Sequence, residues 1–236
     1  MAALSRQVAA LARVQRSTTS KVMYNQGVSV LPLGNALADG YRVDPLTNFS
    51  SWNRTFGTDA DDEQGKRAMI RNTNCQWVIN SNESDPVGIS MFVVSIKKVG
   101  SDLLSGGALG TLTNGTHYVG NGSKVLLNLN YFKLHYVKRF IQGAYSTNRI
   151  ALGSAPAVQS IPSETQSLSK MGKFNLKYNM GKGLAVQNPS GDWKAGGYPK
   201  SDTQNYFLLT FTDNSTTDLE SPYLSYQAVH TVEVSA

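Results

Sequence analysis

The segment from Leu126 to Gly143, LLNLNYFKLHYVKRFIQG, constrains the fold more than any other part of this chain, because it is the longest apolar stretch and lies in the most cationic region. Tyr, Phe, Val and Ile fill the segment and Gly143 closes it, which favours a β-strand. The four-residue spacing of Phe132, Tyr136 and Phe140 is also compatible with a helix. We expect a strand.

Alternation along this strand predicts one apolar side and one basic side. The apolar side carries Phe132, Leu134, Tyr136 and Phe140. The basic side carries Lys133, His135, Val137, Arg139 and Ile141. We expect the apolar side to face a core and the basic side to stay open. A one-residue bulge would exchange the two sides, and Lys138 already falls on the apolar side.

The segment from Lys173 to Tyr178, KFNLKY, repeats this arrangement. Its apolar positions are Phe174, Leu176 and Tyr178. Its polar positions are Lys173, Asn175 and Lys177. A half-buried antiparallel strand with a cationic open side has this alternation. The two strands together predict one basic surface.

Positive charge is concentrated in this half of the chain. Between Lys124 and Lys182 there are nine Lys or Arg residues and one acid, Glu164, which gives a net charge of +8. The formal net charge of the whole chain is +6, so the remaining residues sum to −2. A regional excess of positive charge indicates a polyanionic partner more strongly than a uniform one would.

The overall composition predicts an all-β protein. A chain of 236 residues with 40% hydrophobic residues, 16% charged residues and 21 Gly is typical of a folded chain with many turns. Alternating βα units are missing, which disfavours parallel α/β folds. Further strands are expected at Gly27 to Leu33, Lys66 to Asn80, Val87 to Val99, Asn205 to Thr212 and Tyr223 to Val234. About eight strands with long loops predict an eight-stranded antiparallel jelly-roll sandwich.

The first residues form a separate basic segment. Residues 1–22 are expected to be an arm, and residues 23–236 the jelly-roll domain. The arm carries four cations and no acid: Arg6, Arg13, Arg16 and Lys21. It is either a frayed tail or an arm that becomes ordered on a nucleic acid or a neighbouring subunit. We expect no signal peptide and no transmembrane helix, because no long apolar run is present.

Catalytic and metal-binding patterns are missing from the sequence. The single cysteine, Cys75, shares a strand side with Trp77 and Ile79, which predicts a buried thiol and excludes an intrachain disulfide. The histidines lack a partner at metal-ligand spacing, and no hydrolase or metalloprotease motif occurs. We therefore expect no enzymatic activity, no cofactor and no metal site.

Two loop regions leave alternatives open. The run TDADDEQG gathers four acids between Asp59 and Glu63, which predicts either a solvated turn or a Ca²⁺ site without EF-hand spacing. The loop after KFNLKY contains Trp193 and Tyr198. These aromatic residues either cover the end of the sandwich or stack on a ligand.

Three segments resemble the capsid proteins of small circular single-stranded DNA viruses, the circovirus-like group. They are NYFKLHYVKRFIQG, KMGKFNLKYNMGKG and QNYFLLTFTDNSTTDLESPYLSYQAVHTVEV, which together span roughly the last half of the chain. The resemblance lies in strand pattern and composition and includes no invariant short motif. Capsid proteins of small RNA viruses and satellite viruses share the jelly roll and remain alternatives.

The resemblance implies a virion protein that assembles with about sixty copies of itself into an icosahedral, T=1 shell around a single-stranded DNA or RNA genome. It also implies an unidentified host receptor, no membrane partner, and passage through the host nucleus during assembly. The nucleic-acid-binding residues it implies are Arg6, Arg13, Arg16, Lys21, Lys133, His135, Arg139, Lys173 and Lys177. The four arm cations are sparser than the arginine-rich arm with which such proteins usually begin.

The sequence therefore favours a capsid protein that packages its genome by electrostatic, sequence-independent contacts. The rival function is a non-viral, lectin-like β-sandwich that binds carbohydrate through Trp193, Tyr198 and the Gly-rich loops.

Overall fold

The computed structural model describes residues 19–31, 40–47, 67–81, 87–105, 108–142, 168–178, 184–186, 205–213 and 222–235. The longer strands are β1 (Thr19–Val30), β2 (Tyr41–Pro45), β3 (Arg67–Ser81), β4 (Val87–Ile96), β9 (Phe132–Gln142), β10 (Leu168–Lys177), β12 (Tyr206–Thr212) and β13 (Tyr223–Ser235). The short strands are β5 (Leu104–Ser105), β6 (Ala108–Leu109), β7 (Tyr118–Val119), β8 (Leu126–Leu127) and β11 (Leu184–Val186). Two 3-10 helices, η2 (Lys98–Leu103) and η3 (Gly122–Lys124), complete the described elements. Within these ranges no helix has the length and apolar character needed to cross a bilayer.

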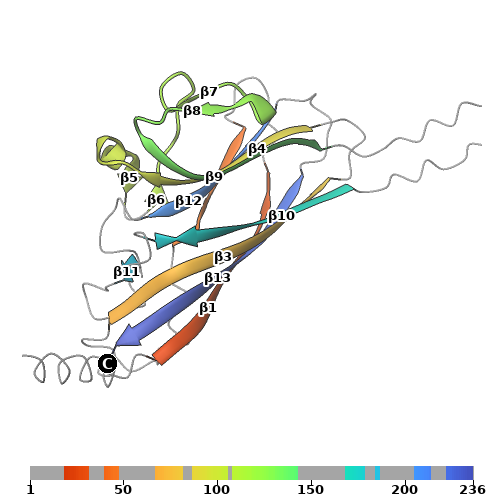
Figure 1. Ribbon diagram of the computed structural model, residues 1–236. Helices are drawn as coiled ribbons and strands as arrows, with labels where there is room; N and C mark the ends of the chain where they lie inside the picture. The colour runs from red at the N-terminus through yellow and green to blue at the C-terminus, as the bar shows by residue number, and fades with distance from the viewer. Residues whose placement is uncertain are drawn as a thin grey trace, which may run out of the picture.

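The eight longer strands form two antiparallel sheets (Figure 1). Sheet A has the order β1-β13-β3-β10, with β11 also paired to β3, and sheet B has the order β2-β12-β4-β9. Along the chain the pairs are nested: the first long strand pairs with the eighth, the second with the seventh, the third with the sixth and the fourth with the fifth. A long antiparallel ribbon rolled into two sheets has this pairing, so the predicted jelly roll is confirmed.

Most strands lie where the alternation placed them, but several assignments differ. The expected strand from Leu126 to Gly143 is divided into β8 and β9, with residues 128–131 between them. β1 begins at Thr19 and therefore includes Lys21, which the sequence assigned to the arm. β2 lies between the expected strands Gly27 to Leu33 and Lys66 to Asn80, where no strand was predicted, and β11 lies in the loop after KFNLKY. These strands, like β5, β6 and β7, have five residues or fewer, too few for alternation to be recognised.

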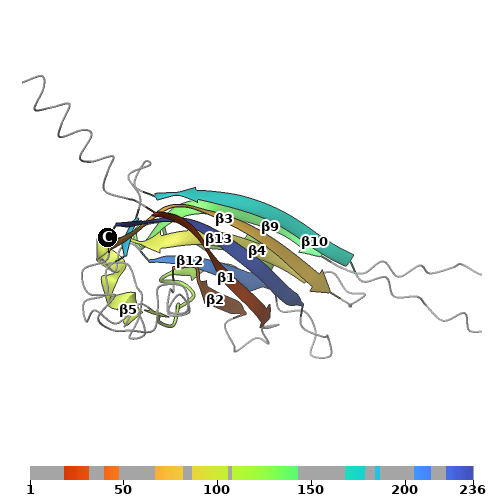
Figure 2. The same ribbon diagram turned by 90° about the horizontal axis from the view of Figure 1, so that it is seen from below.

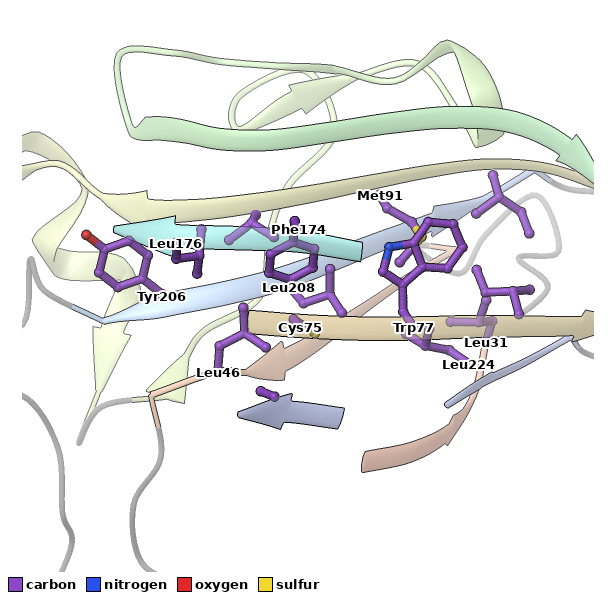
Figure 3. Packing of buried hydrophobic residues seen from close by; sticks show 14 of the residues in the cluster. Leu31, Leu46, Cys75, Trp77, Met91, Phe174, Leu176, Tyr206, Leu208 and Leu224 are labelled. Carbon is purple, nitrogen blue, oxygen red and sulfur yellow. The ribbon is translucent and has the colours of Figure 1, made fainter. Parts of the chain in front are cut away.

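The main core lies between the two sheets (Figure 3). Trp77 of β3 stacks on Phe140 of β9, with ring centroids 5.8 Å apart, and Tyr136 of β9 lies 4.9 Å from the ring of Phe174 on β10. Gly172 of β10 lies over the Trp77 indole, where a Cβ atom would collide with the ring. These contacts fix β9 opposite β10 and β3, so the two edge strands lie on the same side of the sandwich.

A second core covers the outer side of sheet B. The segment between β4 and β9, residues 98–131, folds back over this side, and β7 and β8 lie beyond β4 and β9 in Figure 1. Its apolar side chains contact Phe92 and Val94 of β4 and Phe211 of β12. Every residue of β4 and of β12 is therefore buried. The continuous apolar run of β4 follows from burial on both faces.

The covering segment is held to sheet B at η3. The Ser90 hydroxyl of β4 donates to the Gly122 carbonyl at 2.5 Å. Beside it, the Gly88 amide of β4 donates to a carboxylate oxygen of Asp213, the residue after β12, at 2.7 Å. Gly122 has φ +50° and lies against Asp213, so a side chain at this position would be strained and would clash. A glycine is therefore required where the segment meets the sheet.

Candidate nucleic-acid interface

A bulge at His135 corrects the predicted sides of β9. Val93 of β4 pairs with Tyr136, whereas the next residue, Val94, pairs with Leu134, so His135 has no partner in the register. Beyond such a bulge, every side chain moves to the other side of the sheet. The predicted grouping of Phe132 and Leu134 with Tyr136 and Phe140 is therefore wrong.

Because of the bulge, Lys133 and His135 lie on the side of sheet B that faces sheet A, at the edge of the sandwich. Lys133 pairs with Ser95, on the side of sheet B that faces sheet A. The His135 Nε2 atom lies 2.8 Å from the Ser95 hydroxyl, and its ring centroid lies 4.7 Å from that of Tyr206. Burial, together with the Lys133 charge, lowers the pKa of His135. The imidazole is therefore neutral at pH 7 and supplies no positive charge to a phosphate.

Arg139 lies on the opposite, outer side of sheet B. Its Nη2 atom donates to the Val125 carbonyl at 2.9 Å, and its guanidinium carbon lies 5.5 Å from the centre of the Phe92 ring. A cation over an aromatic face and a charged hydrogen bond to a carbonyl both stabilise the folded chain. Arg139 thus holds the covering segment against β9 and has a structural role.

Lys138 and Lys170 join Lys133 along the opening between the two edge strands. Lys138 pairs with Met91, and Lys170 of β10 pairs with Ile79, so both start from the inner sides of their sheets. All three lysines are exposed. We call Lys133, Lys138 and Lys170 the edge lysines.

The outer side of sheet A differs from that of sheet B, because no described element lies across it (Figures 1 and 2). Its side chains alternate with the core residues of β3, β10 and β13. The register aligns them in five rows across these strands. The rows are Tyr223–Asn80–Ser169, Ser225–Val78–Met171, Gln227–Gln76–Lys173, Val229–Asn74–Asn175 and Thr231–Asn72–Lys177. We call this surface the open face.

Hydrogen bonds between side chains order the polar rows of the open face. The Asn175 amide nitrogen donates to the Asn74 amide oxygen at 2.5 Å. The Ser169 hydroxyl donates to the Asn80 amide oxygen at 2.6 Å, and the Thr231 hydroxyl donates to that of Asn72 at 3.0 Å. Each of these three Asn amides on β3 accepts from a neighbouring strand. Its NH₂ group is an additional pair of donors.

The cations of β9 and β10 have no acidic counterpart. The two strands contain six Lys or Arg residues and no Asp or Glu. None of the six forms an ion pair within the described ranges, where the ion pairs join Arg42 to Asp44 at 3.1 Å and Arg71 to Glu233 at 2.5 Å. The hydrogen bond from Arg71 lowers the pKa of Glu233, which borders the open face. Glu233 therefore stays ionised, and the charge of Arg71 compensates its negative charge.

The predicted interface residues thus separate into three places. Lys173 and Lys177 share the open face, Lys133 and His135 lie at the opening between the sheets, and Arg139 lies on the outer side of sheet B. Lys21 lies in β1, opposite Val232. Arg6, Arg13 and Arg16 lie outside the described residues, as do the acidic run from Asp59 to Glu63, Trp193 and Tyr198.

The residues that complete the open face were not among the predicted interface residues. The alternation of Asn72, Asn74 and Gln76 with buried Thr73, Cys75 and Trp77 is visible in the sequence RNTNCQWVINS. That pattern could have predicted an amide-rich strand side beside the lysines of β10. Pairing between β3 and β10, however, is not encoded locally.

No catalytic arrangement occurs in the described residues. Cys75 is fully buried, as predicted, and desolvation raises its pKa to about 12, so the thiol is unreactive at neutral pH. Buried Thr73 contacts both the Tyr178 hydroxyl and His230 Nδ1, each at 2.6 Å, between the sheets. No group of three or more His, Cys, Asp or Glu residues in these ranges could hold a metal ion.

Comparisons with known proteins give weak matches to solved structures and no match to a sequence family or curated protein. No family model matches the chain, and no curated protein has significant sequence similarity to it. The structure of Desmodium yellow mottle tymovirus is 13% identical over 91% of this chain and 89% of that chain, with a TM-score of 0.31. The VP1 pentamer of human polyomavirus 6 is 11% identical over 90% of this chain and 80% of that chain, with a TM-score of 0.13. At these TM-scores the fold assignment rests on the strand pairing of this chain alone.

Proposed function

We propose that this chain is a virus capsid protein that assembles with copies of itself into a closed icosahedral shell and packages a single-stranded genome. The fold is a jelly roll, an architecture used by viral capsid proteins and also by lectins and cupins. The circovirus-like resemblance of the second half of the chain adds a T=1 shell of about sixty copies and a DNA genome to the proposal.

The observation that carries the proposal is the exposed, acid-free positive charge along the two edge strands, β9 and β10. Lys133 and Lys138 of β9, together with Lys173 and Lys177 of β10, are exposed and have no ion-pair partner among the described residues. Lysines that pair with phosphates release counterions, so the resulting affinity is independent of sequence and falls with salt. Genome packaging requires this kind of contact.

Electron microscopy of the purified chain tests shell formation directly. We expect closed particles of uniform diameter that contain nucleic acid, which ultraviolet absorbance and nuclease protection would detect. A species that stays monomeric across salt and pH would refute the capsid function.

Three matched pairs of substitutions test the electrostatic contacts. Lys173→Gln with Lys177→Gln, and Lys133→Gln with Lys138→Gln, each remove two exposed charges. The pair Lys98→Gln with Lys124→Gln removes two exposed charges from the covering segment and is the control. Arg139 is left unchanged because it holds the covering segment.

For single strands, each lost phosphate contact reduces the slope of log K against log salt by about 0.7. We therefore expect each β9 or β10 pair to reduce the slope by about 1.4 and the packaged nucleic acid to fall, while the control pair has no effect. Lysines on edge strands also prevent edge-to-edge pairing. Variants that aggregate with an unchanged salt slope would show that the lysines only protect the edges, and would contradict their packaging role.

A further inference from the structure

Amide side chains are unusually frequent on the open face. It carries six Asn or Gln side chains, namely Asn72, Asn74, Gln76, Asn80, Asn175 and Gln227. Asn is depleted in β-strands because its side chain fits a pleated surface poorly. Four of these six are Asn on the paired strands β3 and β10, where Thr or Val would stabilise the sheet better. The side chains of Asn72, Asn74 and Asn80 accept hydrogen bonds from neighbouring strands through their oxygens, and their NH₂ groups are further donors on the face.

The open face also exposes one aromatic and one aliphatic side chain. Tyr223 is 46% exposed and Met171 is 71% exposed, in neighbouring rows at one end of the face. Lys173 and Lys177 lie towards the other end, both on β10, which is the edge strand. The face thus has a cationic margin along β10 and an amide surface on β3 and β13, with an aromatic ring at one corner.

This arrangement matches the three parts of an extended nucleotide chain. Lysines bind phosphates, Asn and Gln form hydrogen bonds with base edges, and an exposed aromatic ring stacks on a base. Successive rows are about 6.7 Å apart, so the five rows extend about 27 Å along the strands. The grooves of a duplex admit a helix or a two-stranded ribbon but not the flat face of a sheet, so these amides reach the edges of unpaired bases.

We propose that the open face binds single-stranded nucleic acid through its bases, with the β10 lysines holding the phosphates and Tyr223 stacking on a base. This proposal rests on the capsid function proposed above and adds a base-contacting surface to the electrostatic contacts. It predicts a preference for single strands over duplex, which phosphate contacts alone would not give.

A binding assay with a base-contact variant tests this preference. The variant combines Asn74→Thr, Gln76→Thr and Tyr223→Thr, since Thr has high β-propensity and should preserve the sheet. The control combines Asn121→Thr and Val119→Thr. Both control residues are exposed on the covering segment, and Asn121 has an extended backbone and no capping hydrogen bond. Neither variant changes the net charge.

The probes are a fluorescent single-stranded deoxyoligonucleotide of mixed sequence and a duplex of the same length, titrated with the full chain at several salt concentrations. We expect the base-contact variant to bind the single strand at least 10-fold more weakly, with an unchanged salt slope and unchanged affinity for the duplex. The loss of one stacked base alone corresponds to a factor of this size. The control variant should bind as the wild type does.

The outcomes separate this proposal from the capsid function. If the base-contact variant binds the single strand with wild-type affinity, or loses single-strand and duplex affinity equally, the base contacts are refuted while salt-dependent packaging stands. If the wild-type chain binds neither probe in a salt-dependent manner and forms no particles, the capsid function fails, and the open face loses its proposed ligand. Circular dichroism of each variant confirms that the sheets are intact.

Discussion

The outer sides of the two sheets have opposite environments although the sheets belong to one jelly roll. The outer side of sheet B lies beneath residues 98–131, and β4 and β12 are buried at every position. The outer side of sheet A is the open face, and β3 alternates between buried and accessible residues. One side of the molecule therefore contributes a second core, while the other presents ordered polar groups to solvent.

This difference shows how a single sandwich can separate stability from binding. Burial on both faces makes β4 and β12 the most apolar strands, and burial of apolar surface is the main stabilising contribution. Polar residues on the open face contribute little to burial, so they are free to be selected for a ligand. Substitutions that compare the two sides can test this division.

The largest expected effect is at Phe92, on the covered side of sheet B. Phe92 is 1% exposed and lies 5.9 Å from the Phe211 ring. Phe92→Ala should destabilise the fold by about 3 to 5 kcal/mol, because it removes buried contacts and leaves a cavity. Tyr223→Ala, on the open face, should change stability by less than about 0.5 kcal/mol. Urea denaturation measures the free energy of unfolding of both variants. Comparable destabilisation by the two substitutions would show that Tyr223 is buried by another part of the protein.

A smaller effect is the pH dependence of stability that comes from His230, on the buried side of β13. His230 faces the core and burial lowers its pKa to about 4, whereas Thr231 faces outwards. The unfolded chain binds this proton near pH 6.5 and the folded chain only near pH 4. Stability is therefore fully present above pH 6.5 and falls by about 3 kcal/mol as the pH approaches 4. Urea denaturation between pH 7 and 4 measures this loss.

Tyr178, which shares the Thr73 hydroxyl with His230, remains neutral over this range, since burial raises its pKa. His135 contributes in the same direction, because burial also lowers its pKa. The variant His230→Gln should therefore lose most of the pH dependence, while His117→Gln, on the covering segment, should retain it. An unchanged pH dependence in His230→Gln would mean that another group dominates acid unfolding.

The smallest effect distinguishes two adjacent cations on β9. Arg139→Met removes the hydrogen bond to the Val125 carbonyl and the contact with Phe92, and should cost about 1 to 2 kcal/mol. Lys138→Met, on the other side of the strand, should change stability by less than about 0.5 kcal/mol. Urea denaturation at high salt measures the difference. Equal changes in stability would contradict the structural role of Arg139, which would then again be a candidate for binding nucleic acid.

Local sequence pattern was sufficient to predict the strand-rich fold, the buried thiol of Cys75 and the two sides of β10. Alternation is a local property, so Phe174 and Leu176 could be assigned to the core, and Lys173 and Lys177 to solvent, without knowledge of the partner strand. The same pattern predicted an antiparallel sandwich, because half-buried strands must cover their apolar sides against a second sheet.

Which strand sides become surfaces depends on contacts between distant parts of the chain. The bulge at His135 comes from the register of β9 against β4 and is not marked by a glycine or another local signal. It places Lys133 and Arg139 on opposite sides of sheet B, although alternation predicted one shared side. The covering of sheet B likewise depends on residues 98–131 folding back over it. Pairing and covering involve residues far apart in the chain, and local alternation carries no information about them.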